Sequence, residues 1–142
     1  MSHAETVETY LLRSEAPHEQ VEDSTWVVHP GSGHHRVVVK VQDPIVLFST
    51  GILQVPESPA GESGTYDQIA SREELYKTLL ELNDQLLHAS YGLQGKQVVL
   101  SGAHELSHLD LNEFQAVLDD MAMALDTHLE KLARWGATSQ EA

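Results

Sequence analysis

The sequence predicts an α+β domain in which helices pack on one face of an antiparallel sheet. Three stretches rich in valine and isoleucine come first, and their short links favour an antiparallel meander. Two leucine-rich stretches with helical spacing then flank a short hairpin. With a short N-terminal helix, these stretches give the element order α-β-β-β-α-β-β-α. We assign this order to a single domain over residues 1–142.

The N-terminal segment, residues 1–17, is predicted to hold a short acidic helix over residues 2–15. Ser2 is a suitable N-cap, and Glu5 stands three residues later, as in a capping box. Pro17 ends the segment. We expect the helix to dock on the domain because it has one apolar stripe with helical spacing. The stripe consists of Val7, Tyr10 and Leu11.

Three strands are predicted next, over residues 26–29, 34–41 and 45–50. Turn residues between Pro30 and Gly33, and again at Asp43-Pro44, separate these strands. The third strand could continue to Val55, with a bulge or bend at Gly51. Residues 56–66 contain two prolines and two glycines and are predicted to form a flexible loop.

The second helix is predicted to begin after Ser71, an N-cap with Glu74 in the capping-box position. It should run to about Ala89. Leu80 and Leu87 widen its apolar face, so we expect this helix to be buried on more than one side. The main apolar face consists of Leu75, Leu79, Leu82 and Leu86.

A hairpin with its turn at Gln94-Gly95 follows, and its second strand, residues 98–100, is expected to end at Ser101-Gly102. Asp110, with Glu113 three residues later, is predicted to cap the last helix. That helix keeps one face apolar as far as Leu132 and ends at Gly136. Residues 137–142 are predicted to be a disordered tail.

Composition excludes several classes of function. The chain has 8 basic and 22 acidic residues, for a net charge of −14, and the basic residues are scattered. Direct nucleic-acid binding is therefore not expected, because it needs clustered Lys and Arg to neutralise phosphates. The acidic surface could attract basic protein surfaces, or it could simply keep the protein soluble.

The compartment is predicted to be the cytoplasm. No apolar segment reaches the ~20 residues of a membrane span, and the acidic N-terminus does not resemble a signal peptide. The chain has no cysteine, which excludes a disulfide framework, thiolate zinc sites and a cysteine nucleophile.

One string suggests metal chemistry. His104-Glu105-Leu106-Ser107-His108 matches H-E-x-x-H, in which a helix places both imidazoles on one face and Glu acts as general base at zinc. Here the string precedes the predicted cap Asp110, so we expect it to lie in a loop that Leu106 and Leu109 anchor. A third ligand is also needed, and no candidate has convincing spacing. We therefore predict no metal site and no cofactor.

The remaining polar groups have ordinary structural interpretations. His34 and His35 are adjacent in a strand, so one should be exposed and the other half-buried. His88 and His128 are predicted to lie on helix surfaces. The carboxylate pairs Glu73-Glu74 and Asp119-Asp120 do not face one another on a helix and should be solvated. No G-x-S-x-G elbow or phosphate loop is present, so no catalytic activity is predicted.

Several hydrophobic patterns resemble the YbjN family, whose fold is similar to that of type III secretion chaperones of the Tir-chaperone kind. The patterns are Leu80-Glu81-Leu82-Asn83, Tyr91-Gly92-Leu93, Val98-Val99-Leu100, Leu106 with Leu109, and the helix over residues 111–132. The likeness extends from about Trp26 to Leu132. It implies a small acidic homodimer that binds other proteins and has no catalytic residues. Chaperones of this fold hold partner segments in extended form along sheet and helix surfaces.

Three hypotheses for function follow. The first is a non-enzymatic, chaperone-like homodimer that binds other proteins, with its interface on the last helix or at an uncovered sheet edge. The interface candidates on that helix are Phe114, Met121, Met123 and Leu125. The second is an acidic modulator that docks on basic nucleic-acid-binding proteins. The third is a small zinc hydrolase that uses His104, His108 and Glu105.

Overall fold

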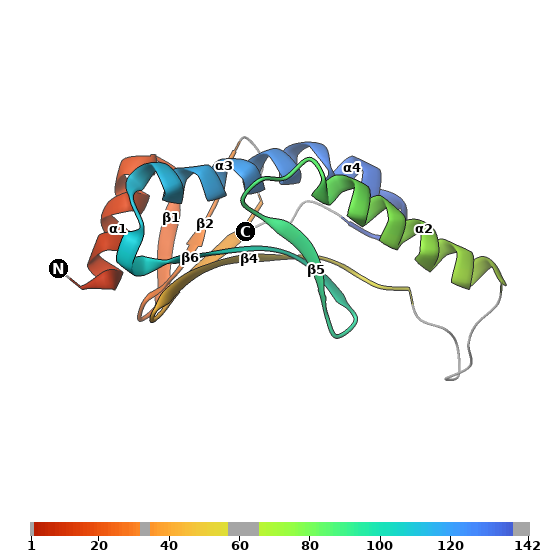
Figure 1. The fold of residues 1–142 in the computed structure, drawn as a ribbon, viewed down its shortest axis with the longest axis horizontal. Coiled ribbons are helices and arrows are strands. Elements are labelled where there is room, and N and C mark those ends of the chain that lie inside the picture. The colour runs from red at the N-terminus through yellow and green to blue at the C-terminus, as the bar shows by residue number, and fades with distance from the viewer. Residues whose placement is uncertain (1, 32–34, 57–65, 138–142) are drawn as a thin grey trace.

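The computed structural model describes residues 2–31, 35–56 and 66–137 and shows an antiparallel sheet with helices on one face (Figure 1). The sheet has six strands in the order β1-β2-β3-β4-β6-β5. The strands are β1 (His18–Glu22), β2 (Thr25–Val28), β3 (Val37–Gln42), β4 (Ile45–Gln54), β5 (Ser90–Gln94) and β6 (Gln97–Glu105). The α-helices are α1 (His3–Ser14), α2 (Tyr66–Asn83), α3 (Leu111–Thr127) and α4 (Leu129–Leu132). The α+β class and the helices on one face are as predicted.

The caps predicted for the first helix, at Ser2, and for the last helix, at Asp110, are both present. The Ser2 hydroxyl accepts a hydrogen bond from the Glu5 N–H at 3.1 Å. At α3 the capping box is complete, because Asp110 accepts from the Glu113 N–H at 2.7 Å while the Glu113 carboxylate accepts from the Asp110 N–H at 3.3 Å. Such caps satisfy N–H groups that have no partner within the helix.

The sheet contains one strand that the sequence analysis missed. β1 pairs with β2 across a tight turn in which Ser24 has φ of 60°. Its five residues are polar or exposed and lack the alternation that marks a strand, so only pairing with the hydrophobic β2 defines it. The order of main elements is therefore α-β-β-β-β-α-β-β-α. The bulge predicted near Gly51 is confirmed, because the β4–β6 register shifts between Gly51 and Leu53.

Three predicted boundaries were wrong. α2 begins at Tyr66, so Ser71 lies inside the helix, where its carbonyl and hydroxyl oxygens accept from the Trp135 indole N–H. α2 also ends at Asn83, and residues 84–89 form a connection to β5. β6 runs past Ser101-Gly102 to Glu105, because its pairing with the long strand β4 continues to that point.

The last helix is not continuous. α3 ends at Thr127, His128 separates it from α4, and a 3-10 turn then leads to Gly136, which has φ of 101°. Ala137 was predicted to lie in a disordered tail but is buried, whereas residues 138–142 lie outside the described part of the chain. Of the predicted flexible loop over 56–66, residues 57–65 also lie outside it.

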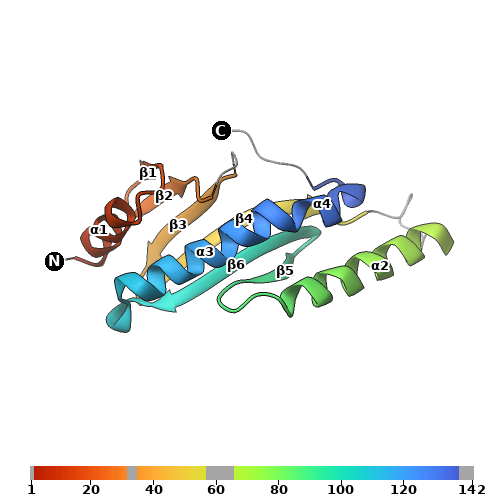
Figure 2. The same ribbon diagram turned by 90° about the horizontal axis from the view of Figure 1, so that it is seen from above.

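A single hydrophobic cluster fills the space between the sheet and the helices. Phe48 of β4 meets Phe114 of α3, with ring centroids 5.3 Å apart. Val37 and Val39 of β3 are fully buried on the helix side, while Val38 between them is partly exposed on the other side. Figure 2 shows the helices along one face of the sheet, and none of the described helices covers the opposite face.

Candidate docking surface

The histidine string does not form the geometry of a zinc protease. His104 and Glu105 are the last residues of β6, and Leu106–His108 form a 3-10 turn. The loop assignment was therefore wrong for the first two residues, while Leu106 and Leu109 are buried as predicted. His104 and His108 are consequently not a helical i, i+4 pair. Among the described residues, no group of three or more His, Asp or Glu could hold a metal ion.

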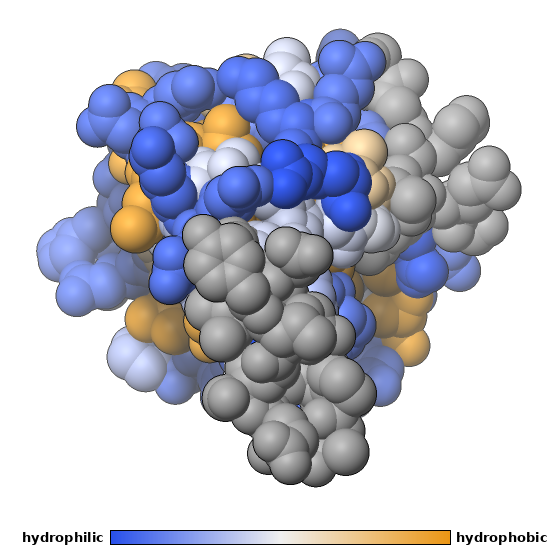
Figure 3. Space-filling view, turned by 90° about the vertical axis from the view of Figure 1, so that its right-hand side faces the viewer, coloured by the Kyte–Doolittle hydropathy of each residue, from blue (hydrophilic) through white to orange (hydrophobic). Residues whose placement is uncertain are grey.

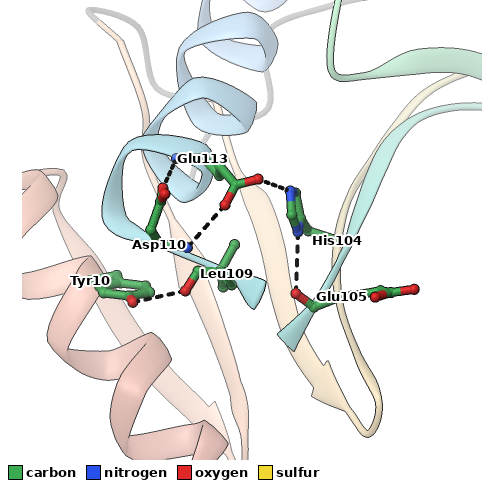
Figure 4. A network of polar contacts seen from close by, with 6 residues as sticks. All are labelled: Tyr10, His104, Glu105, Leu109, Asp110 and Glu113. Carbon is green, nitrogen blue, oxygen red and sulfur yellow. Dashed lines mark hydrogen bonds and ion pairs between the residues drawn. The ribbon is translucent and has the colours of Figure 1, made fainter. Parts of the chain in front are cut away.

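The first histidine instead joins β6 to α3 (Figure 4). His104 Nε2 lies 2.8 Å from Glu113 Oε2, and Nδ1 lies 3.2 Å from the Glu105 carbonyl oxygen. The Tyr10 hydroxyl donates to the Leu109 carbonyl at 3.1 Å, which ties α1 to the same junction. These contacts fix the turn from the sheet into α3, so this network is structural.

Three of the four predicted interface residues lie inside the core. Phe114 and Met121 are 0% exposed and Leu125 is 4% exposed, because the sheet packs against this face of α3. Met123 is partly buried against the same cluster. Their side chains therefore pack within one chain, and an interface that uses them stays a prediction.

Of the exposed large apolar side chains in the described part of the chain, three lie on α1, β1 and β3 (Leu12, Val21 and Val38), and four lie on α2, the connection of residues 84–89 and β5. Leu80 is 70% exposed, Leu87 86%, Leu93 52% and Tyr76 37%. We name these four residues the α2–β5 surface. The prediction that Leu80 and Leu87 are buried was wrong. From the end of the molecule that carries α2, hydrophobic patches are visible among hydrophilic ones (Figure 3).

The hydrogen bonds of α2 show which way this surface faces. Tyr76, Leu80 and Asn83 share one flank of the helix, since they are four and three residues apart. The Asn83 side chain bonds both main-chain groups of Tyr91, accepting from its N–H at 2.7 Å and donating to its carbonyl at 3.2 Å. Tyr76 and Leu80 therefore lie on the flank that borders the outer edge of β5.

The same contacts define the free edge of the sheet. β5 is an edge strand, and the Tyr91 main-chain groups that point away from β6 are already bonded by Asn83. Main-chain direction alternates along an antiparallel strand, so the groups of Leu93 also point outward. Asn83 thus blocks part of the edge. A partner at the α2–β5 surface would therefore pack mainly on side chains rather than add a long strand.

A polar network holds the connection of residues 84–89 in place. Asp120 Oδ2 accepts from the N–H groups of Leu87, His88 and Ala89 at 3.0, 2.7 and 2.9 Å. Asp120 was predicted to be solvated, so this contact with the connection was missed. Its position in α3, next to buried Met121, was the available signal that its side chain lies near the buried face. His88 was expected on a helix surface and instead lies in this connection.

Two histidines are more buried than predicted. His128 was expected on a helix surface, yet it is 1% exposed and bonds Tyr91 and Gln85. His35 was expected to be exposed or half-buried, and it is buried, with Nε2 3.5 Å from Asp126 Oδ1. His34 lies outside the described residues.

The uncovered face of the sheet carries a row of small, uncharged side chains, which Glu19 of β1 continues beyond β2, and the exposed Lys40 of β3 lies beside that row. The strand register aligns one row of residues across five strands on this face. The row consists of Val27, Val38, Ser49, Ser101 and Ser90. A hollow of about 390 Å³ lies over its β5 end, with Leu47, Gln94 and Ala103 among its lining residues. Serine hydroxyls and His88 also line this hollow.

None of the helices in the described part of the chain is long and apolar enough to cross a membrane. Comparison with solved structures shows the same fold in two proteins of low sequence identity. An uncharacterized protein from Methanothermobacter thermautotrophicus has a TM-score of 0.65 at 16% identity, covering 95% of this chain and 100% of that chain. YbjN, described as a putative transcription regulator from E. coli, has a TM-score of 0.52 at 13% identity, covering 87% and 91%.

No curated protein matches the sequence. The CesT_Tir_1 family model matches residues 1–138, which is nearly the whole chain. This match agrees with the sheet, the helix arrangement and the YbjN-like fold described above. The chain therefore belongs to the CesT_Tir_1 family, whose members have a type III secretion chaperone-like fold.

Proposed function

We propose that this protein is a non-enzymatic homodimer that binds segments of other proteins. The observation that carries the proposal is the α2–β5 surface, where Leu80 and Leu87 are 70% and 86% exposed. Exposed leucines on the surface of a strongly acidic protein favour a contact surface. Membership in a chaperone-like family supports protein binding as the general activity.

The two faces of the molecule suit different roles in this proposal. The α2–β5 surface joins two copies by side-chain packing, because Asn83 already occupies part of the neighbouring strand edge. The uncovered sheet face holds the partner segment in extended form. Its central row lacks charge, and its serine hydroxyls can exchange hydrogen bonds with a peptide.

The dimer is tested by light scattering and sedimentation of the wild type and the Leu80→Glu variant. Burial of one leucine contributes about 1.5 kcal/mol or more, and a two-fold interface buries it twice. The variant should therefore weaken association by about 3 kcal/mol, or more than about 100-fold. Leu12→Glu is the matched control, because Leu12 is 64% exposed on α1, at the other end of the molecule. A wild type that is monomeric at micromolar concentration rejects the dimer.

The partner face is tested separately with a photo-crosslinking residue at Val38, which is partly exposed on the uncovered face. Partner peptides should attach there and should not attach at Arg13, an exposed position on α1. Equal labelling at both positions would show that the sheet face has no special role.

A second candidate function is docking on basic proteins, and one observation favours it. Arg13 is the only Lys or Arg among residues 2–31, while α1, its C-cap and β1 carry exposed glutamates. These are Glu5, Glu8, Glu15, Glu19 and Glu22. α1 and β1 lie side by side at one end of the molecule (Figure 2). An acidic end of this kind attracts a basic surface by complementary charge.

This second function is tested by the binding of a lysine-rich peptide at low and high salt. Affinity should fall strongly with salt, because exposed charges are screened. Glu19→Gln with Glu22→Gln should weaken binding at low salt, whereas Glu73→Gln with Glu81→Gln on α2 should not. An affinity that does not change with salt would contradict the electrostatic explanation.

A further inference from the structure

The buried ring of His128 connects the break between α3 and α4 to the α2–β5 end. Its Nδ1 lies 2.9 Å from the Tyr91 hydroxyl of β5, and its Nε2 lies 3.1 Å from Gln85 Oε1 in the connection of residues 84–89. His128 is 1% exposed and Tyr91 is 7% exposed. Three parts of the chain that are distant in sequence therefore meet at one imidazole.

The two contacts of the ring favour one neutral tautomer. Gln85 Oε1 can only accept, so Nε2 carries the proton. A neutral ring then has no proton on Nδ1, which accepts from the Tyr91 hydroxyl. In this neutral form the Nε2 proton and the Tyr91 hydroxyl proton each have an acceptor.

A second proton on the ring would break this arrangement. It would place an N–H on Nδ1 opposite the Tyr91 oxygen, so the hydroxyl proton would have to turn away. Nδ1 of His128 is the only bonding partner of that hydroxyl among the described residues. A buried donor without an acceptor is costly, and so is a buried charge.

The charged groups around the ring, taken together with burial, favour the neutral form. Burial lowers the pKa of His128, and the positive charge of Lys131 on α4 lowers it further. The Asp120 carboxylate on α3 acts in the opposite direction. Burial also raises the pKa of Tyr91 on β5, so that group stays a neutral phenol.

We propose that His128 is a proton-sensitive latch, whose protonation releases the connection of residues 84–89 from α3 and α4. The other attachments of the connection are the burial of Leu86 and Ala89 and the three N–H groups that bond Asp120. Its opening frees the end of α2 and the start of β5. The inference concerns contacts within one chain, so it stands whether or not two copies associate.

The latch is tested by amide hydrogen exchange of the full chain at pH 7.5 and 5.5, with protection corrected for intrinsic rates. If only the open form binds the second proton, with an ordinary histidine pKa, protection should fall by about tenfold. The fall should appear at the amides of Leu87, His88 and Ala89 and not at those of β2. Unchanged protection, or an equal fall in β2, overturns the proposal.

Variants separate the latch from general acid effects. In His128→Gln the pH dependence at residues 87–89 should disappear, whereas His108→Gln, at an exposed position of the 3-10 turn, should keep it. Persistence of the full pH dependence in His128→Gln overturns the proposal. If that variant does not fold, the protonation of the His128 ring is titrated in the wild-type protein. A midpoint at pH 6.5 or higher overturns the proposal.

Discussion

Replacement of Asp120 by alanine should destabilise the protein by about 2 kcal/mol. One carboxylate oxygen accepts from three successive N–H groups of the connection between α2 and β5. Hydrogen bonds to charged groups are worth about 1.5–3 kcal/mol each when no water can replace them. Leu87 and His88 are exposed, so water can replace the carboxylate there at small cost. Ala89 is 8% exposed, and its N–H would supply most of the loss.

The neighbouring residue provides the matched control. Asp119 is exposed and accepts from the Gln115 side chain, one turn earlier on α3, at 2.7 Å. Such helix pairs contribute about 0.2–0.5 kcal/mol, so Asp119→Ala should be nearly neutral. The assay is urea unfolding of both variants, with the midpoint compared at an unchanged slope. Equal losses for the two variants, or a loss below about 0.5 kcal/mol for Asp120→Ala, would refute the reasoning.

Three further outcomes are expected. Gly102→Ala should lower the free energy of unfolding by about 1–3 kcal/mol in urea, because the added Cβ would lie 2.9 Å from the His88 carbonyl oxygen. Gly92→Ala is the control: a Cβ there meets open space, so the loss should be under about 1 kcal/mol. Glu113→Ala should cost about 1 kcal/mol through loss of its part of the capping box, measured as a lower thermal midpoint. Stability should fall as the pH drops below 6.5, by at most about 1.4 kcal/mol per pH unit, because burial lowers the pKa of His128 and the unfolded state then binds more protons. The fall should level off below the folded-state pKa and should be missing from His128→Gln, as urea midpoints at several pH values will show.

Local signals predicted the parts of the fold that local chemistry decides. The caps at Ser2 and Asp110 depend on residues three apart, so both were predictable from the sequence. The β5–β6 turn followed from Gln94-Gly95, and Gly95 indeed has φ of 62°. The same rule failed at Ser71 with Glu74, because a capping pattern does not exclude a helix that already began upstream.

Elements that depend on distant partners could not be predicted. The sequence of β1 has no alternating hydrophobic pattern, and the strand is defined by its antiparallel pairing with β2. The extension of β6 through His104 follows from its pairing with β4, so a string that looked like a loop lies partly in the sheet. His128 could not be recognised as buried, because its partners Tyr91 and Gln85 lie 37 and 43 residues away in the sequence.

The exposed and buried leucines of α2 show why burial could not be predicted from helical spacing alone. Helical spacing identifies which side chains share a face but does not show what lies opposite that face. Leu75 and Leu79 meet the core, whereas Leu80, one position farther round, faces the outer edge of β5. On α3 the sheet already covers the face that holds Phe114 and Met121. Helical spacing alone therefore does not distinguish the apolar side chains that fill the core from those that stay exposed.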